Sequence, residues 1–392
     1  MAMGRRDHFT RIFGVLLVIC LLWFVQRYLP HLRRLLVRKL SRLKLLMGIC
    51  TGMGPSKRQR RKYDIFVRKL REGGCAKDDT EIEKLFPRHF ERIGHVVIVK
   101  LNNTVSLNEF AQCAKAFAQS FYPRAVSVVL VDLHGIAGEL REPQLKIVWS
   151  ADPLSIMEPK DSLKYALRQK AMDSVLTEND ARKFEICTNS KTFATHVENG
   201  IRYSFDVCQA MFCSGNGVER MHFANIVAKD EVVVDMFSGI GYFTLPLAVH
   251  GCVKIIHALE KNENSAVYLK FNALQNRVSH LINVLHGDNR EVGSELCGQC
   301  NRVIMGYLPS CSHFLHRALS FLRLSISGKP VGTIHYHFVA PKNHARQVLE
   351  EQIKSALGDI VFHSLRVADI RNVKSYAPKQ FHFVADLVFP SV

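Results

Sequence analysis

Residues 201–392 show apolar runs that alternate with segments of helical spacing. Short runs rich in Val and Ile predict buried strands, and apolar residues three or four positions apart predict the helices between them. The predicted strands are VVVDMF, VKIIHALE, LINVLHGD, RVIMGYL, VGTIHYHFV, IVFHSLRVADI and HFVADLVF, and the predicted helices are YFTLPLAVHG, NSAVYLKFNALQN, CSHFLHRALSFLRL and HARQVLEEQIKSAL. This order predicts an α/β fold with a doubly wound, mostly parallel sheet, to which the last two strands add an antiparallel edge.

Residues 63–200 carry a less regular pattern, which predicts a smaller α+β domain before the main one. Residues 95–101 and 125–133 are β-rich, and residues 106–121 have apolar positions at helical spacing behind a serine cap. This part has no catalytic motif, so we expect it to be an accessory, RNA-binding domain.

Residues 1–62 form a predicted basic tail, whose last part, the run MGPSKRQRRKYD, is interpreted as a linker or basic arm. Residues 1–60 contain 13 Lys or Arg and one acid, and so hold 12 of the 18 surplus positive charges. The apolar run IFGVLLVICLLWFV, residues 12–25, lies on the border between the ~20 apolar residues of a spanning helix and the ~7–15 of a signal-peptide core, and no small-residue cleavage site follows it. We interpret it as an uncleaved anchor in contact with a membrane or as a targeting segment. The alternatives are a buried helix or a misplaced start codon.

The cysteine spacing indicates the cellular compartment of the protein, and its net charge indicates the class of its binding partner. The 11 cysteines have irregular spacing and predict no disulfide framework, which favours a reducing, cytoplasmic location. A mitochondrial location, or an anchor on an intracellular membrane through residues 12–25, is the alternative. The formal charge of +18 favours a polyanionic partner such as nucleic acid. Cys297 and Cys300 form a lone CxxC without a second ligand pair, so no metal site is predicted.

Polar residues and glycines follow four successive predicted strands. Because the carboxyl ends of parallel strands meet at one edge of a sheet, these residues are expected to line one crevice. They are Asp235, Gly239 and Gly241 after the first strand, Glu260 after the second, Asp288 and Asn289 after the third, and Gly306 and Tyr307 after the fourth. Each has a structural alternative, such as a cap or a turn, but their coincidence at successive strand ends favours a binding site.

The glycine loop after the first strand restricts the class of ligand. A dinucleotide loop has a third glycine where this chain has Thr244, and a phosphate-binding loop has a lysine that is absent here. A ligand without phosphates, such as S-adenosylmethionine, fits better. Glu260 would accept hydrogen bonds from its ribose hydroxyls, and the Asp288-Asn289 pair would read its adenine amino group.

Several segments of the chain resemble a family of tRNA-modifying enzymes. They are VENGIRYSFDVCQAMFCSGNGVER (residues 197–220), VDMFSGIGYFTLP, HALEKN, HGDNR, VIMGYLPS and VKSYAP, and residues 85–102 and 135–148 resemble the middle domain of that family. The family contains tRNA guanine-N1 methyltransferases that act beside the anticodon and the aminocarboxypropyltransferases of wybutosine synthesis. The resemblance covers residues 63–392. It implies a Rossmann-like class I methyltransferase sheet, S-adenosylmethionine as cofactor, and tRNA, in the second branch tRNA-Phe, as substrate.

The loop after the fourth strand distinguishes the two branches. The methyltransferases have an asparagine followed by a proline there, whereas this chain has Gly306 and an added Tyr307. GIGYFTLP and GDNR also resemble the aminocarboxypropyl branch. We therefore expect transfer of the 3-amino-3-carboxypropyl group of S-adenosylmethionine to a wyosine-type tricyclic guanosine. The alternatives are guanine-N1 methyl transfer and a membrane-tethered RNA-binding relative without catalysis.

In that branch, the resemblance implies cofactor contacts by Cys213, Arg220, Glu260, Asp288 and Asn289. Cys213 stands where serine is usual, and Arg220 stands where lysine is common. Arg220 would offer the methionine carboxylate a fork of donors, while Cys213 is a weaker hydrogen-bond partner than serine. No catalytic base is identified. Asp206 and Tyr307 are candidates to touch the base or the cofactor, and a structural role is their alternative.

Basic residues of the tail and of both domains are candidates for contacts with RNA phosphates. These are Lys57, Arg58, Arg60, Arg61, Arg141, Lys146, Arg371 and Lys374. The alternative for each of them is a solvated surface charge.

Overall fold

The computed structural model describes residues 57–151, 170, 177, 180, 191–226 and 229–390. The chain divides into two compact units, Met1–Arg61 and Lys62–Val392. The apolar segment 12–25 lies outside the described residues, so the anchor stays a prediction, as do the domain boundaries at 62 and 200. Within the described ranges, no helix has the length and apolar character needed to cross a membrane.

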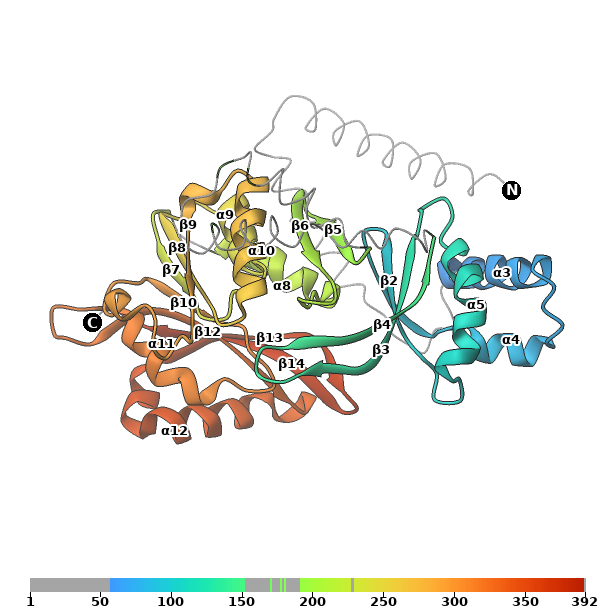
Figure 1. Ribbon diagram of the computed structural model, residues 1–392. Helices are drawn as coiled ribbons and strands as arrows, with labels where there is room; N and C mark the ends of the chain where they lie inside the picture. Colours follow the sequence, from blue (N-terminus) through green and yellow to red (C-terminus); the bar gives the residue numbers. More distant parts are fainter. Residues whose placement is uncertain are drawn as a thin grey trace, which may run out of the picture. The chain divides into compact units, whose positions relative to one another are not determined.

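The larger sheet of the second unit confirms the doubly wound α/β fold (Figure 1). Its strands follow the order β13-β14-β12-β10-β7-β8-β9, with the short β11 paired to β12. Neighbours from β12 to β9 are parallel, and β14 is antiparallel to both β12 and β13. The strands are β7 (Val232–Asp235), β8 (Ile255–Glu260), β9 (Ile282–His286), β10 (Arg302–Met305), β11 (Arg323–Leu324), β12 (Pro330–Ala340), β13 (Arg366–Ala377) and β14 (Gln380–Phe389).

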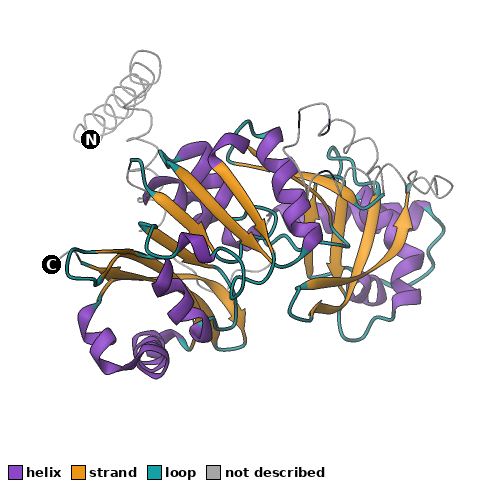
Figure 2. Ribbon diagram, turned by 60° about the vertical axis from the view of Figure 1, so that its left-hand side comes forward, coloured by secondary structure: helices purple, strands orange, loops and turns teal. Residues whose placement is uncertain are grey.

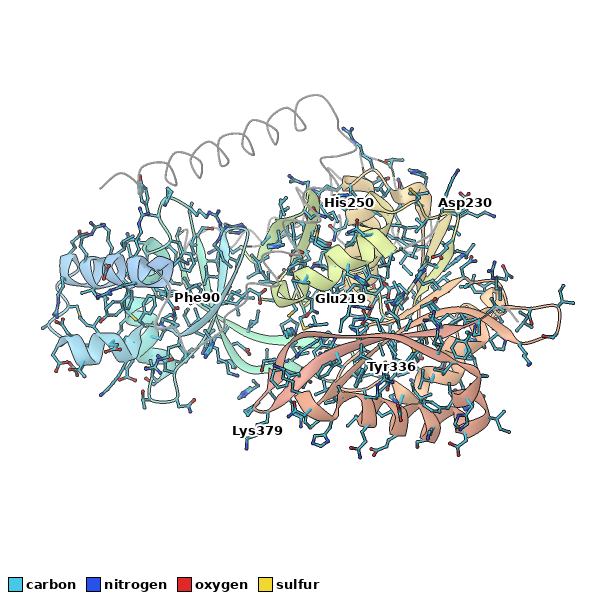
Figure 3. All side chains as sticks on the ribbon, turned by 180° about the vertical axis from the view of Figure 1, so that it is seen from behind. Phe90, Glu219, Asp230, His250, Tyr336 and Lys379 are labelled. Carbon is cyan, nitrogen blue, oxygen red and sulfur yellow. The ribbon has the colours of Figure 1, made fainter. Side chains whose placement is uncertain are left out.

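Helices cover both faces of this sheet (Figure 2), because the central strands are apolar on both sides. Val233 packs into the core beneath α9 and α10, and its neighbour Val234 packs into the opposite core beneath α11 and α12. There, the hydroxyl of the buried Tyr336 donates to Gln352 of α12 at 2.7 Å (Figure 3). The helices are α8 (Gly217–Ile226), α9 (Thr244–His250), α10 (Glu263–Gln275), α11 (Leu315–Phe321) and α12 (Ala345–Ser364).

The strand predicted for IVFHSLRVADI is wrong in its first half. Helix α12 continues to Ser364, past a bend at Gly358 (φ 81°), and β13 begins only at Arg366. After that bend, Val361 and Phe362 pack against the core while Ile360 is exposed, which is a helical and not an alternating pattern. The predicted strand RVIMGYL is likewise shorter than expected, since it ends before Gly306.

The smaller α+β domain is built on a four-stranded sheet in the order β1-β2-β3-β4. Ser106 caps α5, as the pattern predicted, and it also forms a reciprocal capping box with Glu109. Phe90 of β1 stacks edge-on against Phe117 of α5 (Figure 3). The elements are α3 (Lys57–Glu72), α4 (Asp79–Leu85), β1 (His89–Ile93), β2 (Val96–Lys100), α5 (Leu107–Gln119), β3 (Val128–Ala137) and β4 (Glu142–Ser150).

The basic run, predicted as a linker or a basic arm, forms the start of helix α3 from Lys57 onward, and its residues 53–56 lie outside the described ranges. Further along α3, Phe66 and Leu70 are buried in the core of the small domain. Because they are spaced four residues apart, they lie on one face of the helix, and burial of that face stabilises the helix. The charged residues at the start of α3 belong to the same helix.

A hairpin of β5 (Phe193–Glu198) and β6 (Ile201–Asp206) precedes the larger sheet. Its second strand is tied to α10, because the Ser204 N–H donates to Asn272 at 2.8 Å and the Arg202 N–H donates to Asn276 at 2.9 Å. These bonds fix the segment that leads from Asp206 to Cys213.

Candidate functional site

A pocket of about 510 Å³ lies at the carboxyl ends of the central strands, where the sequence predicted a crevice. Its wall comes from the loops after β7 to β10, from β12 to β14 and from the β3–β4 hairpin. The lining includes these predicted site residues: Arg141, Cys213, Gly239, Glu260, Asp288, Asn289, Gly306, Tyr307 and Lys374. Asp206, Arg220, Asp235, Gly241, Lys146 and Arg371 do not line it.

The glycine loop after β7 is held by the acid at the end of β8. The Gly239 N–H donates to Glu260 Oε2 at 2.7 Å, and the Asn262 N–H donates to Oε1 at 2.8 Å. A Cβ at Gly239 (φ +54°) would lie 2.8 Å from the Tyr242 ring. Gly241 (φ +105°) has a packing role instead, because a Cβ there would lie 2.6 Å from Leu245. Both glycines are therefore required by close approach.

Glu260 is the acid best placed to bind a ribose. Burial raises the pKa of its carboxyl to about 7, although the two backbone hydrogen bonds favour the charged form and so lower the pKa. Two backbone donors leave further lone pairs on the carboxylate oxygens. The side chain can therefore accept hydrogen bonds from vicinal hydroxyls of a ligand.

Asp288 and Asn289 follow β9 and differ in whether their side-chain atoms already have polar partners. Asp288 forms ion pairs with Lys261, at 3.0 Å, and with Arg290, and the bonds from Arg290 hold the pKa of Asp288 well below its usual range. The Asn289 Nδ2 donates to the Met236 carbonyl at 2.9 Å, but the buried Oδ1 of Asn289 has no hydrogen-bond partner among the described residues. A buried acceptor without a partner is costly, so this atom fits a donor such as an adenine amino group.

Asp235 lies beneath the loop and outside the pocket. It is fully buried and accepts a hydrogen bond from the Thr244 hydroxyl at 2.8 Å. Burial raises the pKa of Asp235 to about 6. Thr244, the residue that replaces a dinucleotide-type glycine, therefore ties the start of α9 to the end of β7.

Arg220 and Cys213, two of the cofactor contacts that the resemblance implies, are placed differently. Arg220 is 1% exposed and donates to both carboxylate oxygens of Glu198, at 3.0 and 2.6 Å, and to the Cys213 carbonyl at 2.8 Å. Its fork is thus directed to Glu198 and away from the pocket. Cys213 does line the pocket, and its Sγ is 2.7 Å from the Lys374 Nζ. Lys374, predicted as a phosphate contact, therefore brings a positive charge to the pocket wall.

Tyr307 and Asp206, the candidates for contact with the base, have separate positions. Tyr307 lines the pocket with its ring 5.1 Å from that of Phe237, and the Arg141 guanidinium lies 5.4 Å from the Tyr307 ring centre. Asp206 is buried, and its Oδ1 accepts the Cys208 N–H at 2.9 Å in the turn after β6. Only Tyr307 is positioned to face a ligand in the pocket.

The β3–β4 hairpin of the small domain forms part of the wall. Arg141 donates to the Leu308 carbonyl at 2.8 Å, and Asn262 donates to the Leu140 carbonyl at 3.1 Å. Glu139 pairs with Lys261 at 3.0 Å. The small domain therefore contributes directly to the site, as well as offering a basic surface.

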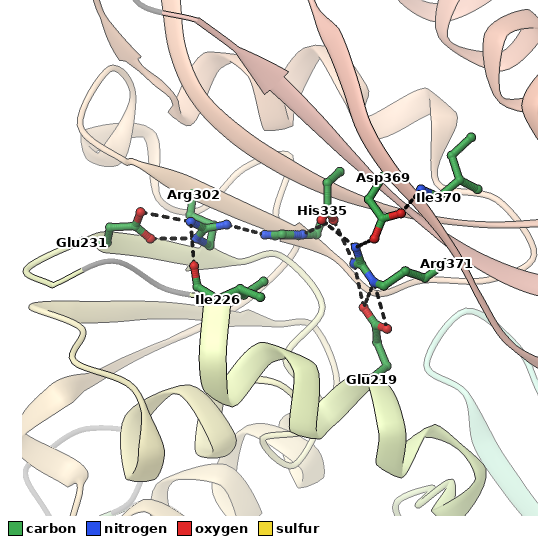
Figure 4. Close-up of polar contacts among 9 residues, drawn as sticks. Glu219, Ile226, Glu231, Arg302, His335, Asp369, Ile370 and Arg371 are labelled. Atoms are coloured by element: carbon green, nitrogen blue, oxygen red, sulfur yellow. Dashed lines mark hydrogen bonds and ion pairs between the residues drawn. The ribbon is translucent and has the colours of Figure 1, made fainter. Parts of the chain in front are cut away.

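Arg371 takes part in a buried charge network (Figure 4). It donates to Glu219 at 2.8 Å and to Asp386 at 2.5 Å, and only 16% of its side chain is exposed. His335 connects Asp386 to Arg302, with 2.7 Å on each side. The cation is thus neutralised within the fold, in contrast to the phosphate contact that the sequence predicted.

The other predicted phosphate contacts have different exposures. Arg60 and Arg61 are exposed on α3, and Lys146 is exposed on β4. The side chains of Lys57 and Arg58 lie outside the described residues. Among the described residues, no three His, Cys, Asp or Glu side chains are arranged to hold a metal ion.

Sequence reasoning missed several pocket residues. Tyr242 and Phe243 line it from the start of α9, and His337 and His382 line it from β12 and β14. The spacing of His335 and His337 on one strand placed them on the same sheet face and was a usable signal. The proximity of His382 depended on the pairing of β12 with β14, which the sequence did not specify.

Comparisons with known proteins agree with this geometry. A family model described as the TRM5/TYW2 methyltransferase domain matches residues 194–361, and one described as the TYW2 N-terminal domain matches residues 76–152. The tRNA(Phe) (4-demethylwyosine(37)-C(7)) aminocarboxypropyltransferase of Methanocaldococcus jannaschii is 30% identical over 303 residues, which cover 77% of this chain and 98% of that protein. Its counterpart of the same name from Pyrococcus horikoshii is 29% identical over 312 residues, which cover 79% and 93%.

A solved structure gives the same result for the fold. The crystal structure of P. horikoshii TYW2 in complex with MeSAdo matches with a TM-score of 0.60 and 25% sequence identity, over 84% of this chain and all of that one.

Proposed function

Since this chain belongs to the family of tRNA(Phe) (4-demethylwyosine(37)-C(7)) aminocarboxypropyltransferases, we propose that it modifies tRNA-Phe beside the anticodon. The reaction transfers the 3-amino-3-carboxypropyl group of S-adenosylmethionine to a wyosine-type tricyclic guanosine. The observation that carries the proposal is that one pocket is lined by Glu260, Gly239 and Asn289, and that the buried Oδ1 of Asn289 has no hydrogen-bond partner among the described residues.

The pocket residues fit the cofactor part by part. Glu260 accepts from the ribose hydroxyls, Asn289 Oδ1 accepts from the adenine amino group, and Lys374 pairs with the methionine carboxylate in place of its contact with Cys213. The bound cofactor supplies an activated carbon attached to a positively charged sulfur. The protein contributes by positioning, because a small displacement between the two reacting carbons greatly reduces the rate.

The loop after β10 favours transfer of the long arm over methyl transfer. Gly306 leaves room for the Phe243 ring, since a Cβ at that position would lie 2.9 Å from it. The asparagine of the methyltransferase branch would collide with this ring. Tyr307 lines the same pocket, so its ring is placed to contact the tricyclic base.

The test is an incubation of the full chain with tRNA-Phe from cells that lack this modification step. S-adenosylmethionine is labelled either in the methyl group or in the carboxypropyl carbons. Carboxypropyl label in the RNA is the expected result, and methyl label would instead assign the guanine methyltransferase activity. Label in neither position, together with no cofactor binding by calorimetry, would indicate an RNA-binding relative without catalysis.

We place the protein in the cytoplasm, on the basis of its irregularly spaced thiols. Residues 12–25 provide the alternative address on an organelle or membrane. Imaging of the full chain beside a version that starts at Lys57 tests this, because only an address in the tail makes the two distributions differ.

A further inference from the structure

Two histidines lie side by side in the wall of the pocket. His337 of β12 and His382 of β14 both line it, with exposures of 1% and 0%. The Nδ1 of His337 is 3.0 Å from the Nε2 of His382, which is a hydrogen bond between the rings. Neither histidine has a role in the cofactor contacts described above.

The outer nitrogens of this pair have no hydrogen-bond partner in the part of the chain that the structure describes. Both the Nε2 of His337 and the Nδ1 of His382 are buried without a hydrogen bond from any described residue. A neutral imidazole carries one N–H, and one of the two N–H groups forms the bond between the rings. Therefore one outer nitrogen is always a bare acceptor and the other always carries a proton, whichever tautomer is present.

The surroundings keep the pair uncharged. Phe243 packs 5.1 Å from the His337 ring, and Lys374 is paired in register with His382 on the neighbouring strand β13. Burial lowers the pKa of His382 to about 4 and that of His337 well below its usual value, with Arg371 and His335 adding to the effect on His337 and Asp386 opposing it. The rings are thus free bases at neutral pH.

The position of the pair relates it to the acceptor base. Met305, the last residue of β10, is in register with Tyr336 of β12. His337 is therefore level with Gly306, at the start of the loop that carries Tyr307. The pair lies against the part of the pocket where the base is expected.

The proposed function, on which this inference rests, requires a proton acceptor. A bond forms between the ring carbon C7 and the arm as the carbon–sulfur bond breaks, and its electron pair leaves with the sulfur as a neutral thioether. The positive charge passes to the base, and C7 must then release its hydrogen as a proton. The pocket carboxylates already have other roles. Glu260 holds the glycine loop and is assigned to the ribose hydroxyls, and Asp288 and Glu139 form ion pairs with Lys261 and Arg290.

We propose that His337 and His382 form a relay that takes this proton. The bare outer nitrogen accepts it from the ring carbon, and the proton between the rings shifts to the second ring. The opposite outer nitrogen then releases its own proton to solvent water in the pocket that both histidines line. The pair then holds the other tautomer and is again neutral, so no net charge stays in the buried wall.

Two variants each remove one outer nitrogen and keep the hydrogen bond between the two side chains, with an amide in place of one ring. In His337→Asn the amide nitrogen replaces Nδ1, and in His382→Gln it replaces Nε2. His280→Asn, at an exposed histidine, is the matched control. Thermal melting checks that each variant is folded, and calorimetry checks that it binds S-adenosylmethionine. We expect both properties to be unchanged, because the relay acts only on the proton of the base.

The deciding measurement is single-turnover arm transfer to tRNA that carries hydrogen or deuterium at C7. In both relay variants we expect the rate to fall at least about tenfold and deuterium to slow it more than in the wild type, because proton loss becomes limiting. Unchanged rates, or slower rates with an unchanged isotope effect, in either variant that still binds cofactor would overturn the relay. Failure of the wild-type protein to transfer the arm would instead overturn the proposed function, and the relay with it.

Discussion

The Gly239 N–H donates to the Glu260 carboxylate at 2.7 Å, so the acid at the end of β8 holds the loop at the end of β7. The same carboxylate faces the pocket, where it is placed to receive ribose hydroxyls. One side chain thus shapes the glycine loop and binds the ligand that lies on it.

Replacement of Glu260 by glutamine should remove a pH dependence of cofactor binding. The raised pKa, about 7, means that the wild-type carboxyl is mostly neutral at pH 6 and mostly ionised at pH 8. Ribose hydroxyls donate to the ionised form, so wild-type affinity should rise about tenfold over this range. Calorimetry at both pH values on the two proteins provides the check, since any titration of the ligand itself is common to both. Equal pH dependence in both proteins would contradict the assignment of Glu260.

Replacement of Lys374 by methionine should weaken the binding of S-adenosylmethionine but not of 5′-methylthioadenosine. The second ligand keeps the adenosine part and lacks the carboxylate. Loss of a charge-assisted bond of about 1.5–3 kcal/mol corresponds to about 10- to 100-fold in affinity. Titration of both ligands measures this, and an equal loss for the two would assign Lys374 to another role.

Replacement of Thr244 by valine should destabilise the fold without changing the volume of the side chain. It leaves the buried Asp235 carboxyl without its hydroxyl donor, which costs about 1–3 kcal/mol in the free energy of unfolding. Thr244→Ser keeps the hydroxyl and is the control. Urea unfolding of the three proteins measures the difference in their free energies of unfolding. A valine variant as stable as the wild type would show that the fold does not need this hydrogen bond.

Replacement of Gly306 by asparagine should reduce arm transfer without producing a methyltransferase. The new Cβ would lie 2.9 Å from the Phe243 ring, and relief of such a clash costs about 1–3 kcal/mol. We expect a tenfold or larger fall in the rate, partly restored by Phe243→Leu in the same chain. Product analysis of the RNA is the measurement. Efficient methyl transfer by the single variant would mean that this position alone selects the transferred group.

The sheet and the positions around Glu260 could be predicted because they depend on local patterns. Apolar runs defined the strands, and the rule that parallel strands present their carboxyl ends together placed Gly239, Glu260, Asn289 and Gly306 in one pocket. The strand assigned around Ile360 was wrong, because the bend at Gly358 and the packing that follows it are tertiary features.

The partners of individual charges could not be predicted in the same way. Nothing in the sequence indicated that Glu198 would occupy the Arg220 fork, or that Arg371 would be enclosed by Glu219 and Asp386. These pairs join residues of different strands and helices, so they depend on how those elements pack together. Lys374 was similarly recognised as basic, while its place beside Cys213 is a tertiary contact between residues 161 positions apart in the chain.

The central claim is that the pocket directs the long arm of the cofactor, and not its methyl group, to the tRNA base. The most direct measurement is the identity of the nucleoside released when unlabelled S-adenosylmethionine reacts with tRNA that carries the tricyclic precursor. Stoichiometric 5′-methylthioadenosine is the predicted product. S-adenosylhomocysteine in its place would contradict the account.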